Sequence, residues 1–187
     1  MLVVGLGNPG TEYAGTRHNV GAEAVELLAA RHGARLQRGR QLALVAEIRL
    51  GTERVALAFP QTYMNESGQA VAPLLRRYGI AELWRLIVVH DELDLPLGKL
   101  QVKAGGGLAG HNGLRSIKAH IHDDGFTRIR IGIGKPPGGK EHGIDHVLKA
   151  PGKKERVELD VSIALAADAV EAIAAEGVVG AQNRFNG

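Results

Sequence analysis

The chain has 187 residues, of which 44% are hydrophobic and 23% charged, ordinary values for a globular protein with one buried core. Its 23 basic and 20 acidic residues give a net charge of +3, which permits an anionic partner such as nucleic acid. The chain has no cysteine, which excludes disulfides and thiolate chemistry and suits the cytoplasm. No apolar stretch approaches the ~20 residues of a membrane span, and the start lacks a signal-peptide pattern. We therefore expect one domain, residues 1–187, without membrane contact.

Apolar periodicity and turn residues predict strands and helices along the first half of the chain. The order is a strand, a helix, a two-stranded hairpin and a helix, at Leu2–Leu6, Val20–His32, Leu42–Leu50 with Arg54–Phe59, and Asn65–Tyr78. Asn65 is placed to cap the second of these helices. Pro73 lies inside that helix and is expected to kink or split it.

The second half continues the alternation, which predicts an α/β fold without repeats or linkers. It comprises a strand, a half-buried strand, a helix, a strand and a long helix, at Trp84–Val89, Leu97–Lys103, Asn112–His122, Phe126–Ile133 and Lys153–Glu176. The long helix is expected to bury Val157, Val161, Ala164, Leu165, Ala169 and Ile173. The Gly-, Pro- and Lys-rich segment 134–143 is expected to be a mobile loop, and the tail after Gly177 to be loose.

A glycine pattern follows the first predicted strand. Gly5-x-Gly7-x-x-Gly10 formally matches the dinucleotide-binding fingerprint. That fingerprint needs the third glycine at the start of a helix that faces the pyrophosphate. Here Pro9 precedes Gly10 and helical periodicity starts only near Val20, so the context disfavours a nucleotide-dependent oxidoreductase.

One histidine and one carboxylate are placed where they can meet. His18 precedes the first helix, and Asp91 follows a buried strand, whose end is a common place for ligands. If the two apolar strands are neighbours, Asp91 can accept a hydrogen bond from one ring nitrogen of His18. The other ring nitrogen can then take a proton as a general base. Structural roles for both, in a loop or turn, remain open at this point.

Polar side chains on the loops supply the rest of a candidate site. Asn8, Asn65 and Asn112 can each start a turn or cap a helix, but together they can donate to a developing oxyanion. Lys103 and Arg130 flank a glycine-rich run and can present two positive charges to one phosphate. A non-catalytic RNA-binding protein would use this glycine loop and the basic region from Arg31 to Arg54.

The only metal-like spacing is weak. His142-x-x-x-His146 has the i,i+4 spacing of a helical metal pair, but no third ligand is evident. We therefore expect neither a metal nor a cofactor.

Taken jointly, ordered blocks of the sequence resemble the bacterial-type peptidyl-tRNA hydrolase family. These blocks are Val4–Gly21, Thr62–Gly68, His90–Gly98, Lys103–Leu114 and Arg128–Gly134. The last third of the chain matches the family by helix placement.

The resemblance implies a monomeric, cytoplasmic enzyme of translation with a mixed, twisted β-sheet surrounded by α-helices. It would hydrolyse the ester that joins a peptide to the 3′-terminal ribose of tRNA, without a metal or cofactor. The resemblance implies catalytic roles for His18, as the base, and for Asp91, Asn8, Asn65 and Asn112. It assigns substrate binding to Tyr13, Met64, Asn65, Gly110, His111 and Asn112. It assigns the tRNA 5′-phosphate to Lys103 and Arg130.

Overall fold

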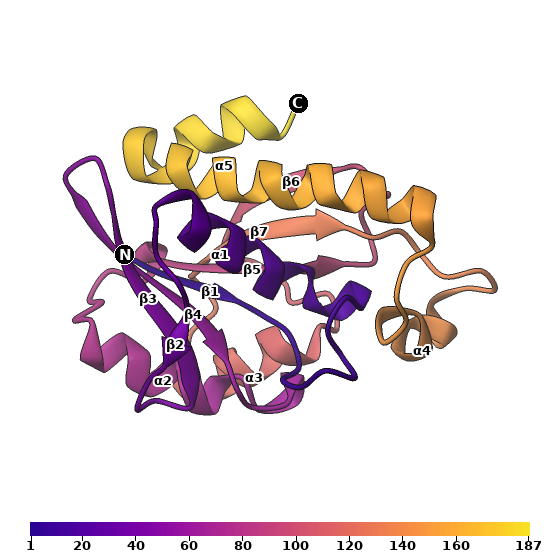
Figure 1. Ribbon diagram of the computed structural model, residues 1–187, viewed down its shortest axis with the longest axis horizontal. Coiled ribbons are helices and arrows are strands. Elements are labelled where there is room, and N and C mark those ends of the chain that lie inside the picture. Colours follow the sequence, from indigo (N-terminus) through magenta and orange to yellow (C-terminus); the bar gives the residue numbers. More distant parts are fainter.

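A seven-stranded mixed sheet runs through the computed structural model, which describes residues 1–187 (Figure 1). The strand order is β2-β3-β4-β1-β5-β7-β6. β1 pairs in parallel with β4 and β5, and β5 with β7, whereas β3 is antiparallel to β2 and β4, and β6 to β7. The strands are β1 (Leu2–Gly5), β2 (Gln37–Arg38), β3 (Ala43–Leu50), β4 (Glu53–Pro60), β5 (Leu86–Glu92), β6 (Leu100–Ala104) and β7 (Thr127–Gly132). The predicted α/β class with a mixed sheet is confirmed.

Helices cover both faces of this sheet. α1 and α5 pack on one face, and α2 and α3 pack on the other (Figure 1). The α-helices are α1 (Val20–Arg31), α2 (Gly68–Arg77), α3 (Asn112–Ile121), α4 (Gly143–Val147) and α5 (Lys153–Phe185). Short 3-10 helices are η1 (Arg17–Asn19), η2 (Met64–Glu66), η3 (Leu83–Arg85) and η4 (Lys140–His142). None of these helices combines the length and apolar character that a membrane crossing requires.

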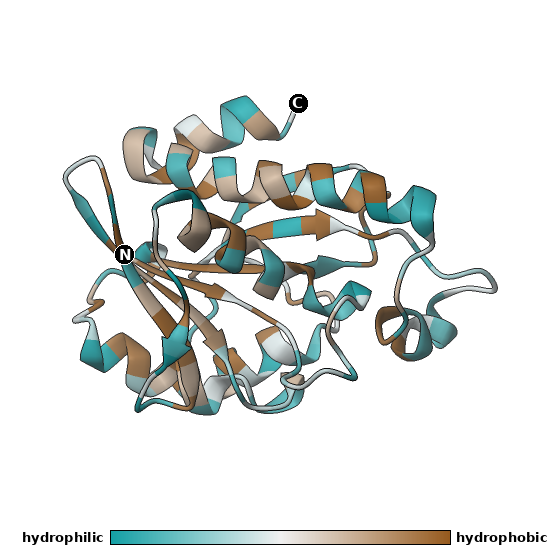
Figure 2. Cartoon of the chain, in the orientation of Figure 1, coloured by the Kyte–Doolittle hydropathy of each residue, from teal (hydrophilic) through white to brown (hydrophobic).

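The central strands are hydrophobic on both sides because both faces are covered (Figure 2). All seven residues of β5 are buried. This strand starts at Leu86 rather than at the predicted Trp84, which lies in η3. Its last residues include His90 and Asp91, so the sheet itself carries these two polar side chains to its C-terminal edge.

Two glycines allow α1 to lie directly against the sheet. A Cβ on Gly21 would lie 2.1 Å from the carbonyl oxygen of Val89, and a Cβ on Gly5 would lie 2.2 Å from that of Gly21. Any larger residue would push α1 away from β1 and β5. Gly5 therefore serves helix packing, and no helix starts at Gly10, which removes the structural basis of the dinucleotide alternative.

Two predictions for the second helix are wrong. Residues 64–66 form the separate turn η2, and α2 begins at Gly68 with Ser67 in the N-cap position, so Asn65 does not cap it. Pro73 does not split α2 either. It lies in the second turn of this ten-residue helix, where its missing N–H removes a single backbone hydrogen bond.

The last helix differs most from its prediction. α5 breaks at Gly177, where φ is 81°, and then continues to Phe185, so the tail is helical and not loose (Figure 1). Val157 and Val161 were expected to be buried but are 67% and 58% exposed. Ala169 and Ile173 are buried as predicted, and Ala164 and Leu165 are half-buried. In the first half of the helix the buried residues are instead Leu159 and Ile163, two positions further along, which lie on the opposite side from Val157 and Val161.

The end of the chain closes one edge of the sheet. Asn186 accepts a hydrogen bond from the backbone nitrogen of Val102 on β6 (2.7 Å) and donates one to its carbonyl oxygen (2.8 Å). Gln182 donates to the same oxygen (3.4 Å). The two side chains thus satisfy backbone groups that an edge strand would otherwise leave free for another chain.

We expect Asn186→Ala to lower the free energy of unfolding by about 1–2 kcal/mol, because it removes two hydrogen bonds and leaves the backbone nitrogen of the buried Val102 without a partner. The matched control is Asn183→Ala, which changes an exposed carboxamide on the same helix. Urea unfolding followed by circular dichroism measures both. Equal stability of the two variants would contradict this role for Asn186.

Candidate active site

A cleft of about 470 Å³ lies at the C-terminal end of β5, between the loops after β1 and β4, the start of α3, and α4. Nine of the residues singled out in the sequence line it: Asn8, Tyr13, His18, Met64, Asn65, Asp91, Gly110, His111 and Asn112. Lys103 and Arg130 lie outside this cleft, on β6 and β7. Residues from four separate parts of the sequence therefore share one site.

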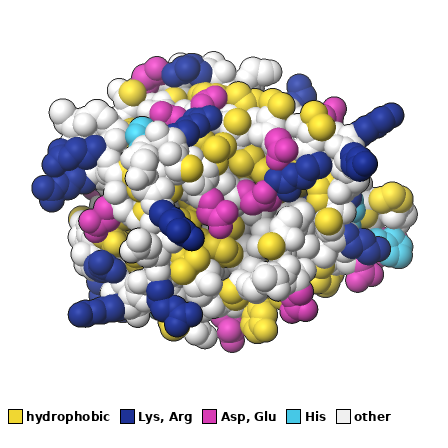
Figure 3. Space-filling model, in the orientation of Figure 1, with side chains coloured by type: hydrophobic (Ala, Val, Ile, Leu, Met, Phe, Trp, Pro, Cys, Tyr) yellow, Lys and Arg dark blue, Asp and Glu magenta, His cyan; other side chains and the backbone are white.

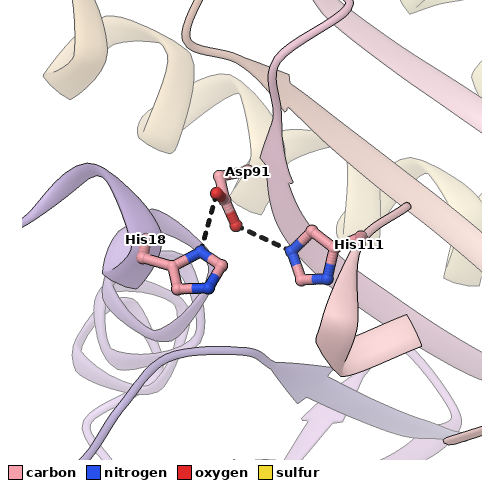
Figure 4. A group of neighbouring side chains, drawn as sticks. All are labelled: His18, Asp91 and His111. Carbon is pink, nitrogen blue, oxygen red and sulfur yellow. Dashed lines mark hydrogen bonds and ion pairs between the residues drawn. The ribbon is translucent and has the colours of Figure 1, made fainter. Parts of the chain in front are cut away.

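Asp91 lies between two imidazole rings at the centre of this cleft (Figure 4). Its Oδ2 is 2.8 Å from Nδ1 of His18, and its Oδ1 is 2.9 Å from Nε2 of His111. Burial alone would raise the pKa of Asp91, but electrostatic attraction and hydrogen bonds from the two histidines hold it well below its usual range. Asp91 is therefore an ionised carboxylate that accepts hydrogen bonds from both rings.

The contact with Asp91 determines which nitrogen of His18 is free. Nδ1 donates to the carboxylate, so in the neutral ring Nε2 carries the lone pair, and it points away from Asp91 (Figure 4). Burial lowers the pKa of His18, but the attraction and hydrogen bond of Asp91 outweigh it, and the pKa is raised above its ordinary value. His18 thus combines an open nitrogen with increased basicity.

His111 connects the same carboxylate to α3. Its Nδ1 accepts hydrogen bonds from the backbone nitrogens of Gly113 (3.1 Å) and Leu114 (3.4 Å), which makes His111 the N-cap of α3. Because Nδ1 accepts, the proton lies on Nε2, which donates to Asp91. Asn112, a possible cap by sequence, is instead the first residue of the helix and leaves its side chain exposed.

His90 supports this arrangement from within the protein. Its Nδ1 donates to the carbonyl oxygen of Asp91 (2.8 Å), and its ring meets that of His111 edge-on at 4.9 Å. Burial, with a smaller effect of His111, lowers the pKa of His90 to about 3. His90 is therefore a neutral residue that packs against Asp91 and His111. No local pattern in the sequence indicates this role of His90.

Asn8 is held by a network that leaves its amide nitrogen free. The side chain of Asn19 bonds both the backbone nitrogen and the carbonyl oxygen of Asn8, each at 2.9 Å. The Oδ1 of Asn8 accepts from the backbone nitrogen of Met64 (2.6 Å). Nδ2 of Asn8 has no partner within the protein, which makes it a fixed donor in the cleft. Sequence reasoning missed Asn19, since nothing local distinguishes a clamping carboxamide from a loop residue.

The remaining predicted residues form the outer walls of the cleft. Asn65 and Asn112 are exposed and line it from η2 and from the start of α3. Tyr13 lies against Tyr63, with their ring centroids 6.3 Å apart in an edge-on arrangement. These polar and aromatic groups are available to a bound molecule.

One wall of the cleft was not identified from the sequence. It consists of apolar residues that extend from Leu93 to α4, namely Ile144, Val147 and Leu148. Ile144 is 72% exposed. The i, i+3, i+4 spacing of the three residues was a detectable helical signal, but the surrounding Gly-, Pro- and Lys-rich segment obscured it. α4 lies at one end of the molecule, beside the short helices η1 and η4 (Figure 1).

The two basic residues expected at a phosphate lie on one face of the sheet. Lys103 is opposite Arg128, and Arg130 is opposite Gln101, which makes Lys103 and Arg130 diagonal neighbours. Arg130 donates to the buried carboxylate of Glu92 through Nε (2.9 Å) and Nη2 (2.8 Å). The pair is thus adjacent, and Arg130 is oriented by an acid that the sequence analysis left without a role.

One group of residues has the ligand types and proximity of a metal site: His18, Asp91 and His111. Each of the nitrogens that faces Asp91 is already engaged in a hydrogen bond with it. His142 and His146 form no such group with a third ligand. Both carboxylate oxygens of Asp91 therefore already have partners within the protein.

The fold and the site together define a hydrolase with an α/β sheet: a carboxylate-oriented histidine, an open ring nitrogen and carboxamide donors share one cleft. The family model described as peptidyl-tRNA hydrolase matches residues 2–187. The chain therefore belongs to the peptidyl-tRNA hydrolase family, and it is an enzyme of that family, as predicted.

Individual relatives are similar to this chain over nearly their full lengths. The peptidyl-tRNA hydrolase of Leifsonia xyli subsp. xyli (strain CTCB07) is 52% identical over 187 residues, which cover 99% of this chain and 96% of that protein. That of Cutibacterium acnes is 47% identical, with coverage of 99% and 97%. The crystal structure of peptidyl-tRNA hydrolase from Acinetobacter baumannii superposes with a TM-score of 0.93 at 42% identity, covering 99% of this chain and 93% of that one.

The geometry predicts how the His18 ring titrates. In the wild type its pKa lies above the ordinary value of about 6.5. Asp91→Asn removes the charge that raises the pKa and leaves the burial that lowers it, so the titration should move below the ordinary value. Nitrogen-15 NMR of the imidazole across pH measures both. Asp94→Asn, whose carboxylate pairs with Lys140 instead, is the control; an unmoved titration in Asp91→Asn would contradict the assignment.

Proposed function

We propose that this enzyme hydrolyses the ester between a peptide, or an N-blocked aminoacyl group, and the 3′-terminal ribose of tRNA, with His18 as the general base. The observation that carries the proposal is the contact of His18 with the buried Asp91, which leaves Nε2 open to the cleft. Membership of the peptidyl-tRNA hydrolase family supports the choice of substrate.

In the proposed reaction, Nε2 of His18 takes a proton from a water molecule as the water oxygen attacks the ester carbonyl carbon. Asp91 stabilises the imidazolium that forms, because its charge remains buried beside the ring. Such general-base help accelerates a reaction by about 10²–10⁴-fold. Since only the neutral ring can accept the proton, the rate should rise as pH increases through the raised pKa of His18.

The carboxamides supply the second part of the chemistry. Three hydrogen bonds to the backbone and the Oδ1 of Asn8 hold this residue in place. Its free Nδ2 can therefore donate to the developing oxyanion without reorganisation. Asn65 and Asn112 are placed at the rim to bind the substrate. When the tetrahedral intermediate collapses, the ester C–O bond breaks and the proton on His18 passes to the ribose oxygen.

The walls of the cleft suit the peptide, and the basic residues suit the tRNA. We assign the peptide side to Tyr13, Met64, Gly110 and His111, with the apolar wall of α4 opposite. Lys and Arg side chains are scattered over the face in Figure 3, at its edge and near its centre, with Asp and Glu side chains among them, and exposed positive charges can contact phosphates. Aromatic residues make up 4% of the chain, which favours recognition by shape and phosphate over base stacking. We expect a monomer that acts in the cytoplasm, where peptidyl-tRNA forms.

His18→Ala should reduce release of the N-blocked amino acid from N-acetyl-aminoacyl-tRNA by at least about 10²-fold, because the base is lost. The assay contains excess chelator, and turnover by the wild type should persist. His32→Ala, a histidine at the end of α1 outside the cleft, is the matched control and should retain activity. Full activity of His18→Ala would reject the mechanism. Binding of tRNA without any hydrolysis by the wild type would favour the non-catalytic RNA-binding alternative.

Lys103→Ala should raise KM several-fold on tRNA with a 5′-phosphate and have little effect on dephosphorylated tRNA. The slope of log(kcat/KM) against log[salt] should fall by about 1, since one phosphate contact is lost. Arg49→Ala removes one charge on β3, near the other edge of the sheet, and serves as the control. An equal loss on both substrates would show that Lys103 acts on the fold and not on the phosphate.

A further inference from the structure

The residue before His18 makes a set of contacts that the proposed chemistry does not use. Arg17 is only 8% exposed, although it is charged and lies at the start of the short η1 turn. Its guanidinium binds the carboxylate of Glu155 through two hydrogen bonds, of 2.8 and 3.1 Å. Nη1 also donates to the carbonyl oxygens of His146 (3.0 Å) and Lys149 (3.3 Å). The backbone nitrogen of Arg17 bonds the same Lys149 oxygen at 3.1 Å.

All these partners belong to a distant part of the sequence that forms the opposite wall of the cleft. His146 lies in the last turn of α4, Lys149 follows that helix, and Glu155 lies in the first turn of α5. Ile144 and Val147 of the same helix line the cleft. One buried guanidinium therefore connects the segment that carries His18 to the wall that faces it.

Only arginine satisfies this set of partners. Its planar group offers five N–H donors in fixed directions, which here reach one carboxylate and two carbonyl oxygens at once. A lysine supplies a single ammonium and cannot span all three. The side chain of His18 forms its hydrogen bond with Asp91 and none with α4 or α5, so the adjacent Arg17 provides the hydrogen-bonded link to that wall.

We propose that Arg17 is a positioning residue for hydrolysis, which holds the His18 segment at a fixed distance from the α4 wall. The inference rests on the proposed function, because it requires His18 to act on a substrate bound against α4. Small displacements of a base from a bound substrate cost about 10²-fold in rate. Loss of the link should therefore lower kcat and leave binding largely intact.

The test compares Arg17→Lys and Glu155→Gln with Arg156→Gln. Arg156 is the matched control: from the same turn of α5 its side chain pairs with Glu23 on α1 and with Asp160, and it forms no hydrogen bond or ion pair with η1 or α4. We expect Arg17→Lys to lower kcat by about ten- to a hundredfold with KM within about threefold of the wild type. Glu155→Gln, which keeps the carbonyl contacts, should show a smaller loss. Arg156→Gln should retain wild-type kcat.

Two further measurements separate positioning from a general loss of stability. The pH midpoint of kcat should stay unchanged in Arg17→Lys, because the His18–Asp91 contact remains. In Arg17→Lys, hydrogen–deuterium exchange should accelerate in both residues 13–19 and residues 140–150. In Arg156→Gln, exchange should be unchanged in both segments. If Arg17→Lys does not fold, Glu155→Gln provides the same comparison.

The outcomes are distinct. Unchanged kcat in folded Arg17→Lys, an equal loss in Arg156→Gln, or a rise in KM alone would overturn the inference and leave the proposed function standing. No hydrolysis by the wild type would reject the proposed function itself, and this inference with it. A fall in kcat with joint acceleration of exchange in the two segments supports Arg17 as the link.

Discussion

The site depends on one buried charge. Asp91 ends a fully buried strand, and a carboxylate there is tolerated only if its oxygens receive strong hydrogen bonds. Both oxygens are engaged, by His18 from the turn before α1 and by His111 from the start of α3. α1 and α3 pack on opposite faces of the sheet. The hydrogen bonds of Asp91 therefore connect the helical layers of both faces at the C-terminal end of β5. The hydrogen bond to Asp91 thus positions His18, the proposed base, and determines that Nε2 is its free nitrogen.

His18 and His111 both bond Asp91, but they differ in which ring nitrogen carries the proton. His111 must accept from the first backbone nitrogens of α3, which commits its Nδ1 and keeps its proton on the side of Asp91. His18 has no such commitment, and its second nitrogen is open to the cleft. The same imidazole thus serves as a helix cap in one position and is available for proton transfer in the other. The difference arises because the second nitrogen of His111 faces the backbone of α3, whereas that of His18 faces the cleft.

Close packing between α1 and the sheet makes this geometry possible. Gly5 and Gly21 bring the helix backbone into contact with β1 and β5, which brings η1 near the end of β5. Gly5, the first glycine of the pattern that formally matches a dinucleotide fingerprint, therefore has a packing function here. Arg17 fixes the other side of the same turn to α4 and α5. The segment that carries His18 is held between the sheet and the opposite wall.

The sequence by itself determined the α/β class, most strand and helix positions, and, through ordered blocks of residues, the family. These features follow from local periodicity and from residue types at fixed spacing, which a linear chain displays directly. Tertiary structure alone decided which face of α5 is buried, the continuation of the chain beyond Gly177, and the α4 wall, because each depends on what packs opposite. It also decided that His111 is the second partner of Asp91, and it decided the partners of Asn8 and Arg17. The contacts of Asp91 with His111, of Asn8 with Met64 and of Arg17 with Glu155 join residues 20, 56 and 138 positions apart, and no local pattern specifies which distant groups will meet.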